Sequence, residues 1–152
     1  MRVATAFDHR GVALRQRVLE ALIELEHDIV DLGERTGEVR VDYPDKAREL
    51  GEALLTDRAD RGILICGSGV GASVAANKLA GIRAAVCHDT YSAHQGVEHD
   101  DMNVLTLGSR VIGPEPAYEC SLAFLGATFS GEPRHQRRLA KVLAMEAAAQ
   151  DS

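Results

Sequence analysis

Five short runs of apolar and β-branched residues alternate with longer segments of helical periodicity along this 152-residue chain. The runs are typical of buried strands, and they cover residues 3–7, 28–33, 62–66, 83–87 and 103–107. Helical periodicity fills the intervals at residues 14–25, 45–57, 71–80 and 115–125. Strand and helix repeated without a long polar break predict right-handed βαβ units and a mostly parallel sheet covered on both faces. We therefore expect one doubly wound α/β domain over residues 1–152.

The tail from Glu132 to Gln150 predicts one more helix, at the C-terminus. Its apolar side carries Leu139, Val142 and Leu143, and spacings of three and four place the basic residues on roughly the other side. The basic group consists of Arg134, His135, Arg137, Arg138 and Lys141. It could be a solvated helix face, or it could bind phosphate, because paired guanidinium groups offer parallel donors to phosphate oxygens.

Charge and composition exclude several classes of function. Lysine and arginine number 17 against 23 acidic residues, and the net charge of −6 argues against general affinity for nucleic acid or anionic membranes. No apolar stretch has the length of a membrane span, and the segment MRVATAF is unlike a signal peptide, so we expect a cytoplasmic protein. The three cysteines contain no C-x-x-C pair, which predicts neither a disulfide framework nor a zinc site.

The segment ICGSGVG, residues 65–71, follows the third predicted strand. Ligands of open α/β sheets gather at the carboxyl ends of the strands, and this segment lies at such an end. Glycines at 67, 69 and 71 allow a sharp turn whose N–H groups could receive an oxyanion or a phosphate. The same donors would favour the thiolate form of Cys66. The alternative is a buried strand cysteine without chemistry.

Known glycine loops fit the segment poorly. Gly67, Gly69 and Ala72, with Asp89 after the next strand, imitate a dinucleotide-binding fingerprint, but that fingerprint normally follows the first strand of its fold. A phosphatase loop needs an arginine where Ala72 stands, and a phosphate-binding NTPase loop needs Gly-Lys-Ser or Gly-Lys-Thr, a context that Lys78 lacks.

Further polar residues are expected at the same edge of the sheet. Asp8-His9 directly follow the first strand, although Asp8 could simply cap the next helix. Asp42-Tyr43-Pro44 open the second helix. His99 lies beside Asp100 and Asp101, where a metal site is conceivable, but no second histidine stands at ligand spacing. Two carboxylates would favour its protonated form, which suits a proton donor.

In combination these segments resemble ribose-5-phosphate isomerase type B, a family that includes galactose-6-phosphate and allose-6-phosphate isomerases. The resemblance rests, in chain order, on Asp8-His9, Asp42-Tyr43-Pro44, residues 62–87, His99, Asn103-Val104-Leu105, Gly108-Ser109-Arg110, Arg134-His135 and Arg138. It implies a three-layer α/β/α Rossmann-like domain that works without metal or cofactor. It also implies a homodimer, or a tetramer, in which each active site draws residues from two subunits.

The resemblance also implies a role for each site residue. Cys66 is expected to remove the proton from the sugar, and Ser68 to assist as a hydroxyl donor. Asp8 and His99 are expected to open the furanose ring. The backbone of Gly67, Gly69, Val70 and Gly71 would hold the enediolate oxygen, and the remaining substrate contacts would come from His9, Tyr43, Asp100, Arg110, Arg134 and Arg138.

Three residues depart from the family pattern. Asp100 replaces the usual asparagine, Ser68 replaces the common threonine, and Arg10 stands where a small residue is usual. The expected reaction is interconversion of ribose 5-phosphate and ribulose 5-phosphate. The departures keep open allose 6-phosphate, galactose 6-phosphate or a tetrose phosphate as substrate, and also a module that binds a phosphosugar or nucleotide without catalysis.

Overall fold

A single parallel sheet forms the centre of the computed structural model, which describes residues 1–152. Its strands pair in the order β2-β1-β3-β5-β4. They span Arg2–Phe7 (β1), Asp28–Asp31 (β2), Arg61–Cys66 (β3), Ala84–Val86 (β4) and Val104–Gly108 (β5). All five predicted strands are present, and every pairing is parallel, where the sequence led us to expect a mostly parallel sheet.

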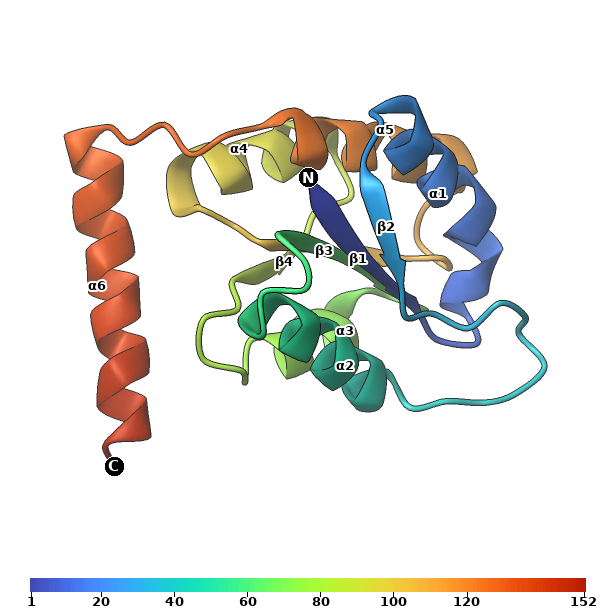
Figure 1. The fold of residues 1–152 in the computed structure, drawn as a ribbon, viewed down its shortest axis with the longest axis horizontal. Helices are drawn as coiled ribbons and strands as arrows, with labels where there is room; N and C mark the ends of the chain where they lie inside the picture. The colour runs from blue at the N-terminus through green and yellow to red at the C-terminus, as the bar shows by residue number, and fades with distance from the viewer.

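Helices cover both faces of the sheet, so the predicted three-layer α/β/α fold is confirmed (Figure 1). Alternate strand residues point to opposite faces. One core contains Val3, Ile63 and Leu105 together with residues of α1 (Arg15–Glu24), α4 (Thr90–Asp100) and α5 (Pro114–Gly126). The other contains Ala4 and Leu64 together with residues of α2 (Tyr43–Leu55) and α3 (Val70–Ala76). A 3-10 turn, η1 (Gly11–Leu14), precedes α1.

Helix α4 is the one element that the periodicity did not predict. Only Ala93 and Val97 of its eleven residues are buried, so its apolar stripe is too narrow to give a clear pattern. Its start does carry a sequence signal, because the Asp89 side chain accepts a hydrogen bond from Ser92 N–H at 2.6 Å. His99 and Asp100 therefore lie in the last turn of a helix that the sequence pattern did not indicate.

Strand order places a crevice beside β1 and β3. From β1 the chain moves to β2 on one side, and then returns to add β3 on the other side. The connections leave these two neighbouring strands in opposite directions, and ligands of doubly wound sheets bind at such a switch point.

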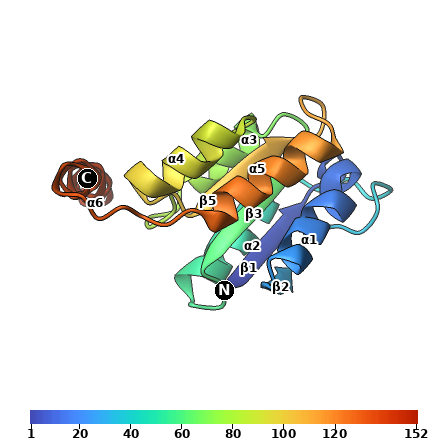
Figure 2. The ribbon, with the colours of Figure 1, turned by 90° about the horizontal axis from the view of Figure 1, so that it is seen from above.

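The last helix, α6 (Pro133–Gln150), stands apart from the body of the molecule (Figure 1). Figure 2 shows it end-on, beyond α4 and separated from the sheet. His135 is its only buried residue. The predicted C-terminal helix is confirmed, and most of its surface is uncovered within one chain.

Candidate active site

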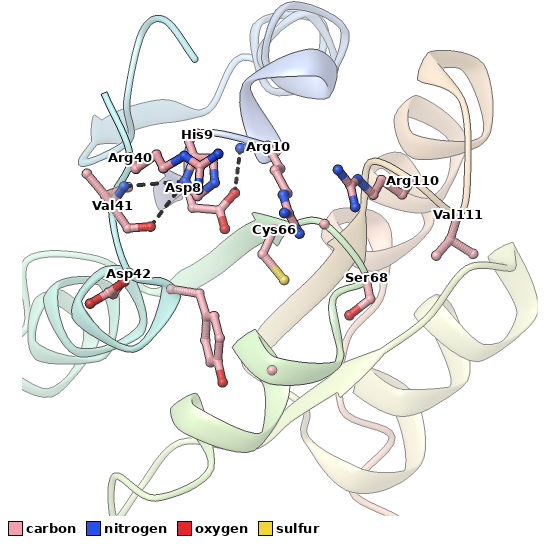
Figure 3. A pocket seen from close by; sticks show the side chains of 13 residues that line it. Asp8, His9, Arg10, Arg40, Val41, Asp42, Cys66, Ser68, Arg110 and Val111 are labelled. Carbon is pink, nitrogen blue, oxygen red and sulfur yellow. Dashed lines mark hydrogen bonds between the residues drawn. The ribbon is translucent and has the colours of Figure 1, made fainter. Parts of the chain in front are cut away.

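A cavity of about 460 Å³ opens at the carboxyl ends of β1, β3 and β5 (Figure 3). Eight of the predicted site residues line it, from four separate segments of the chain: Asp8, His9, Tyr43, Cys66, Gly67, Ser68, Gly71 and Arg110. Sequence reasoning assigned no site role to Arg40, Val41 and Val111, which also line it, and gave Asp42 only a capping role. Arg40 and Val41 precede α2 in an irregular segment, where periodicity carries no information.

Cys66 ends β3 and faces this cavity (Figure 3). Its Sγ accepts a hydrogen bond from Gly69 N–H at 3.1 Å, so a donor lies where negative charge on sulfur would form. The other two cysteines differ, because burial raises the pKa of Cys87 and of Cys120 to about 11. Those two thiols stay protonated at neutral pH, and they belong to the core on the opposite face of the sheet.

Gly69 is fixed by geometry as well as by its hydrogen bond. Its φ of +80° is a left-handed conformation that other residues adopt only at a cost. A Cβ atom there would lie 2.9 Å from the Leu107 carbonyl carbon. The turn that presents an N–H to Cys66 therefore depends on glycine at this position.

Two loops are joined beside the cysteine. Ser109 N–H donates to the Cys66 carbonyl oxygen at 3.0 Å, and Arg110 N–H donates to the Gly67 carbonyl oxygen at 2.9 Å. At Gly108 a Cβ atom would lie 2.4 Å from the Ser68 carbonyl carbon. These contacts hold the loop after β5 against the loop after β3, which brings Arg110 to the cavity.

His88, two residues beyond the end of β4, supports this junction. Its Nε2 accepts the N–H of Gly108 at 2.9 Å, a role that needs the neutral ring. Burial lowers the pKa of His88 below its ordinary value, which keeps the ring neutral at physiological pH. The sequence gave no indication of this contact.

Asp8 both caps the turn that follows it and lies at the candidate site. Its Oδ1 accepts hydrogen bonds from Arg10 N–H at 2.9 Å and Gly11 N–H at 2.8 Å, so it caps the η1 turn. It is also a buried carboxylate that lines the cavity. His9 is held beside it, because His9 Nδ1 lies 3.2 Å from the Val41 carbonyl oxygen and 3.3 Å from the Val41 nitrogen.

Tyr43 and Ser68 complete the walls near α3. A Cβ atom at Gly71 would lie 2.7 Å from Tyr43 Cζ, so the absence of a side chain lets the ring pack against the helix. Ser68 Oγ accepts the N–H of Val70 at 3.2 Å, which leaves the hydroxyl hydrogen to donate elsewhere. The Val70 side chain itself is exposed.

Six predicted site residues do not line this cavity: Gly69 and Val70 belong to the turn beside it, and the other four lie in α4 and α6. His99 and Asp100 end α4, while Arg134 and Arg138 belong to the first turns of α6. His99 stacks on His135 with ring centroids 4.0 Å apart, and Gln95 Nε2 lies 2.9 Å from His99 Nδ1. Within one chain the predicted site is therefore divided into two groups.

The buried residue of this stack, His135, has a lowered pKa. Burial and the charges of His99 and Arg134 lower the pKa of His135. Its Nδ1 lies 2.5 Å from Ser130 Oγ, and Arg134 Nε donates to its Nε2 at 3.3 Å. His135 is thus a neutral ring against which His99 is positioned.

Neither a metal centre nor the dinucleotide fingerprint finds support here. No three histidine, cysteine, aspartate or glutamate side chains gather as metal ligands would. Asp89, the acidic residue of the fingerprint, caps α4, and its hydrogen bond from Ser92 lowers the pKa of the carboxyl.

None of the helices combines the length and the apolar character that a membrane span requires.

The family model described as "Ribose/Galactose Isomerase" matches residues 3–142. The chain belongs to this isomerase family. The recognised resemblance and the predicted enzyme class, an isomerase, are confirmed by this match.

Relatives of this chain are named for isomerisation of more than one sugar phosphate. The chain is 44% identical to ribose-5-phosphate isomerase B of Escherichia coli, over 95% of this chain and 96% of that protein. It is 41% identical to the D-erythrulose-4-phosphate isomerase of Pectobacterium atrosepticum, over 85% of each. The solved structure of ribose-5-phosphate isomerase B from Clostridium thermocellum matches with a TM-score of 0.92 at 40% identity, covering 98% of this chain and 99% of that one.

Proposed function

We propose that this protein interconverts the aldose and ketose forms of a phosphorylated sugar, with Cys66 as the base. The observation that carries the proposal is that a cysteine sulfur, a turn of backbone donors, a buried carboxylate and an arginine line one cavity. Ribose 5-phosphate is the first substrate to test, because several named relatives act on it. A tetrose phosphate is the second, because one relative is an erythrulose-4-phosphate isomerase.

The first chemical step is loss of the C2 proton of the open-chain aldose to the Cys66 thiolate. The C–H electron pair forms a C1–C2 double bond, and the carbonyl electrons move to O1, which becomes an oxyanion. We place that charge beside the backbone N–H groups of the turn at residues 67–71, where Gly69 N–H points to Cys66 Sγ. Such positioned donors contribute on the order of 3 kcal/mol apiece to the transition state.

The second step returns the same proton to C1. The O2 hydroxyl loses its proton as the C2 carbonyl forms, and O1 gains one, so the overall change is an isomerisation. The Ser68 hydroxyl is available as a donor beside these oxygens. His9 and Arg110 hold the phosphate, which is the end of the sugar distant from the reacting carbons. This contact orients C2 toward the sulfur.

A second copy of the chain would complete the site. Helix α6 buries only His135, and Val142 and Leu143 remain 50% and 40% exposed. A lone amphipathic helix has little stability in water until its apolar face is covered. We propose that a homodimer covers it and brings His99, Arg134 and Arg138 of one subunit to the cysteine cavity of the other. His99 would then open the furanose ring with Asp8, and the arginines would join the phosphate contacts.

A substrate panel tests the proposal. Purified protein should form ketose from at least one of ribose 5-phosphate, allose 6-phosphate, galactose 6-phosphate and erythrose 4-phosphate. Cys66→Ala should abolish turnover without loss of folding, because its thiol lines the cavity. The matched control is Cys120→Ala, which removes a buried thiol on the other face of the sheet. Unchanged turnover in Cys66→Ala, or no turnover of any sugar by the wild type, would refute the proposal.

A further inference from the structure

Arg10 lines the cysteine cavity, and the proposed mechanism gives it no role. Its guanidinium forms no ion pair within the chain, unlike that of Arg15, which pairs with Asp31. An unneutralised guanidinium at a concave site favours an anionic ligand. The proposed reaction creates one anion in this cavity besides the substrate phosphate, and that anion is the enediolate.

The backbone on both sides of Arg10 lies against the end of β3. Asp8 N–H donates to the Ile65 carbonyl oxygen at 3.1 Å, and a Cβ atom at Gly11 would lie 2.1 Å from the same oxygen. Arg10 N–H itself donates to Asp8 Oδ1 at 2.9 Å. These contacts fix the start of the Arg10 side chain beside the residue that precedes Cys66.

From there the Arg10 side chain extends over Gly67. Its Cδ and Nη1 lie 3.1 Å and 3.6 Å from the point that a Cβ atom on Gly67 would occupy. Figure 3 shows the side chain directed toward Cys66. Gly67 is the first residue of the turn whose N–H groups the proposed mechanism assigns to the enediolate oxygen. A cation therefore lies beside this turn, next to the proposed base.

We infer that Arg10 is a further catalytic residue, whose guanidinium donates to both oxygens of the enediolate while Cys66 holds the proton. The inference rests on the proposed function and deepens it. In a cis-enediolate, O1 and O2 lie on the same side of the C1–C2 double bond. The planar fork of a guanidinium can donate to two such oxygens at once, whereas a lysine ammonium offers a compact point charge.

One fork of this kind serves both chemical steps. Negative charge develops on O1 as C2 loses its proton, and on O2 as the O2 hydroxyl loses its proton in the second step. A donor that contacts both oxygens stabilises each charge without moving. Arginine stays protonated in proteins, so Arg10 transfers no proton and the balance of the two steps is unchanged.

The interaction should act on the transition state more than on the bound sugar. Arg10 is an exposed residue, so water weakens its field while the cavity is empty. A bound sugar displaces that water, and full negative charge appears only as the enediolate forms. Loss of Arg10 should therefore lower kcat rather than raise KM.

The test compares Arg10→Ala, Arg10→Lys and a control, Arg58→Ala, which removes an exposed arginine in the turn after α2. Calorimetry measures the Kd of two ligands. The hydroxamate of erythronate 4-phosphate has two neighbouring oxygens in one plane and imitates the enediolate, whereas ribitol 5-phosphate has the phosphate without that planar pair. Arg10→Ala should weaken binding of the hydroxamate at least tenfold and of ribitol 5-phosphate less than threefold.

The other measurements give the expected pattern its detail. Arg10→Lys should recover only part of the hydroxamate affinity, and Arg58→Ala should change neither Kd. With the best sugar phosphate, Arg10→Ala should lower kcat at least tenfold and change KM less than threefold. Equal weakening of both ligands in Arg10→Ala would assign Arg10 to the phosphate and overturn the inference. Full hydroxamate affinity in Arg10→Lys would refute the planar fork.

Both ligands bind without turnover, so failure of the inference and failure of the proposed function can be told apart. If the wild type isomerises a sugar and Arg10→Ala matches it in Kd and kcat, the inference falls and the proposed function stands. If the wild type isomerises no sugar but binds the hydroxamate through Arg10, the proposed function falls and a site for a planar anion remains.

Discussion

Replacing Gly69 by alanine should damage both folding and activity, because this one glycine shapes the turn and donates to the cysteine. At φ of +80° an alanine adopts a left-handed conformation, and its Cβ would lie 2.9 Å from a backbone carbonyl carbon that cannot swing aside. Left-handed strain and forced overpacking together cost about 2–4 kcal/mol. For a domain of this size that corresponds to a fall of roughly 5–15 °C in Tm.

Turnover should fall further than stability explains. Relief of the clash moves the residue-69 N–H away from Cys66 Sγ, and misplacement of a reacting group by about 1 Å costs on the order of 10²-fold in rate. The assays are calorimetric unfolding and kcat on the best sugar phosphate, measured below the Tm of the variant.

Gly126→Ala is the matched control, since a Cβ atom there would have no neighbour within 4 Å. It should fold and turn over sugar as well as the wild type does. If Gly69→Ala matched the control in both Tm and kcat, the turn would not be constrained as the geometry indicates. The reasoning about Cys66 would then fail with it.

Three further predictions follow from other parts of the structure. His99→Asn should reduce turnover of ribose 5-phosphate at least tenfold but spare erythrose 4-phosphate, whose O4 carries the phosphate and cannot close a furanose ring; equal losses in a two-substrate assay would contradict a ring-opening role. The folded-state pKa of His88 is lowered, so the hydrogen bond that its neutral ring accepts from Gly108 N–H stabilises the fold fully above the ordinary histidine pKa of about 6.5. This stabilisation is lost as pH falls through the folded-state pKa of His88. His88→Gln, which keeps an acceptor without titrating, should therefore flatten the acid limb of the Tm–pH profile, and an unchanged profile would assign that limb to other groups. Leu143→Glu, on the exposed side of α6, should yield folded monomers without activity; an active monomer in sedimentation and kinetic assays would refute the composite site.

Periodicity was enough to predict the sheet and most of the helices, because the central strands and most helices bury a regular set of apolar residues. Strand β5 is buried throughout, and β3 is buried in every residue except Arg61, so their apolar runs are continuous. Helix α4 failed this rule because two buried residues make no visible stripe. Its capping aspartate, Asp89, imitates the acidic residue of a nucleotide fingerprint in the sequence, because a cap and a ribose ligand require the same side chain.

The order of the motifs along the chain predicted most residues that line the cysteine cavity. It did not predict the contacts that hold these residues in place. Asp8 and Arg110 follow strands and Cys66 ends one, and parallel strands bring such residues to one edge of the sheet. The hydrogen bond from Gly108 to His88 joins residues 20 apart, and the approach of Arg10 to Gly67 depends on a side-chain rotamer. Neither spacing nor composition encodes contacts of that kind.

Because α6 lies apart from the cysteine cavity of its own chain, two inactive variants of the protein should complement each other. If each working centre combines the cysteine of one protomer with the histidine of another, Cys66→Ala and His99→Asn chains are each inactive on ribose 5-phosphate alone. Mixed after unfolding and refolding together, they would form hybrids in which one centre inherits both defects and the other inherits neither. Activity recovered by mixing two inactive variants would show that each active site is built from residues of two protomers.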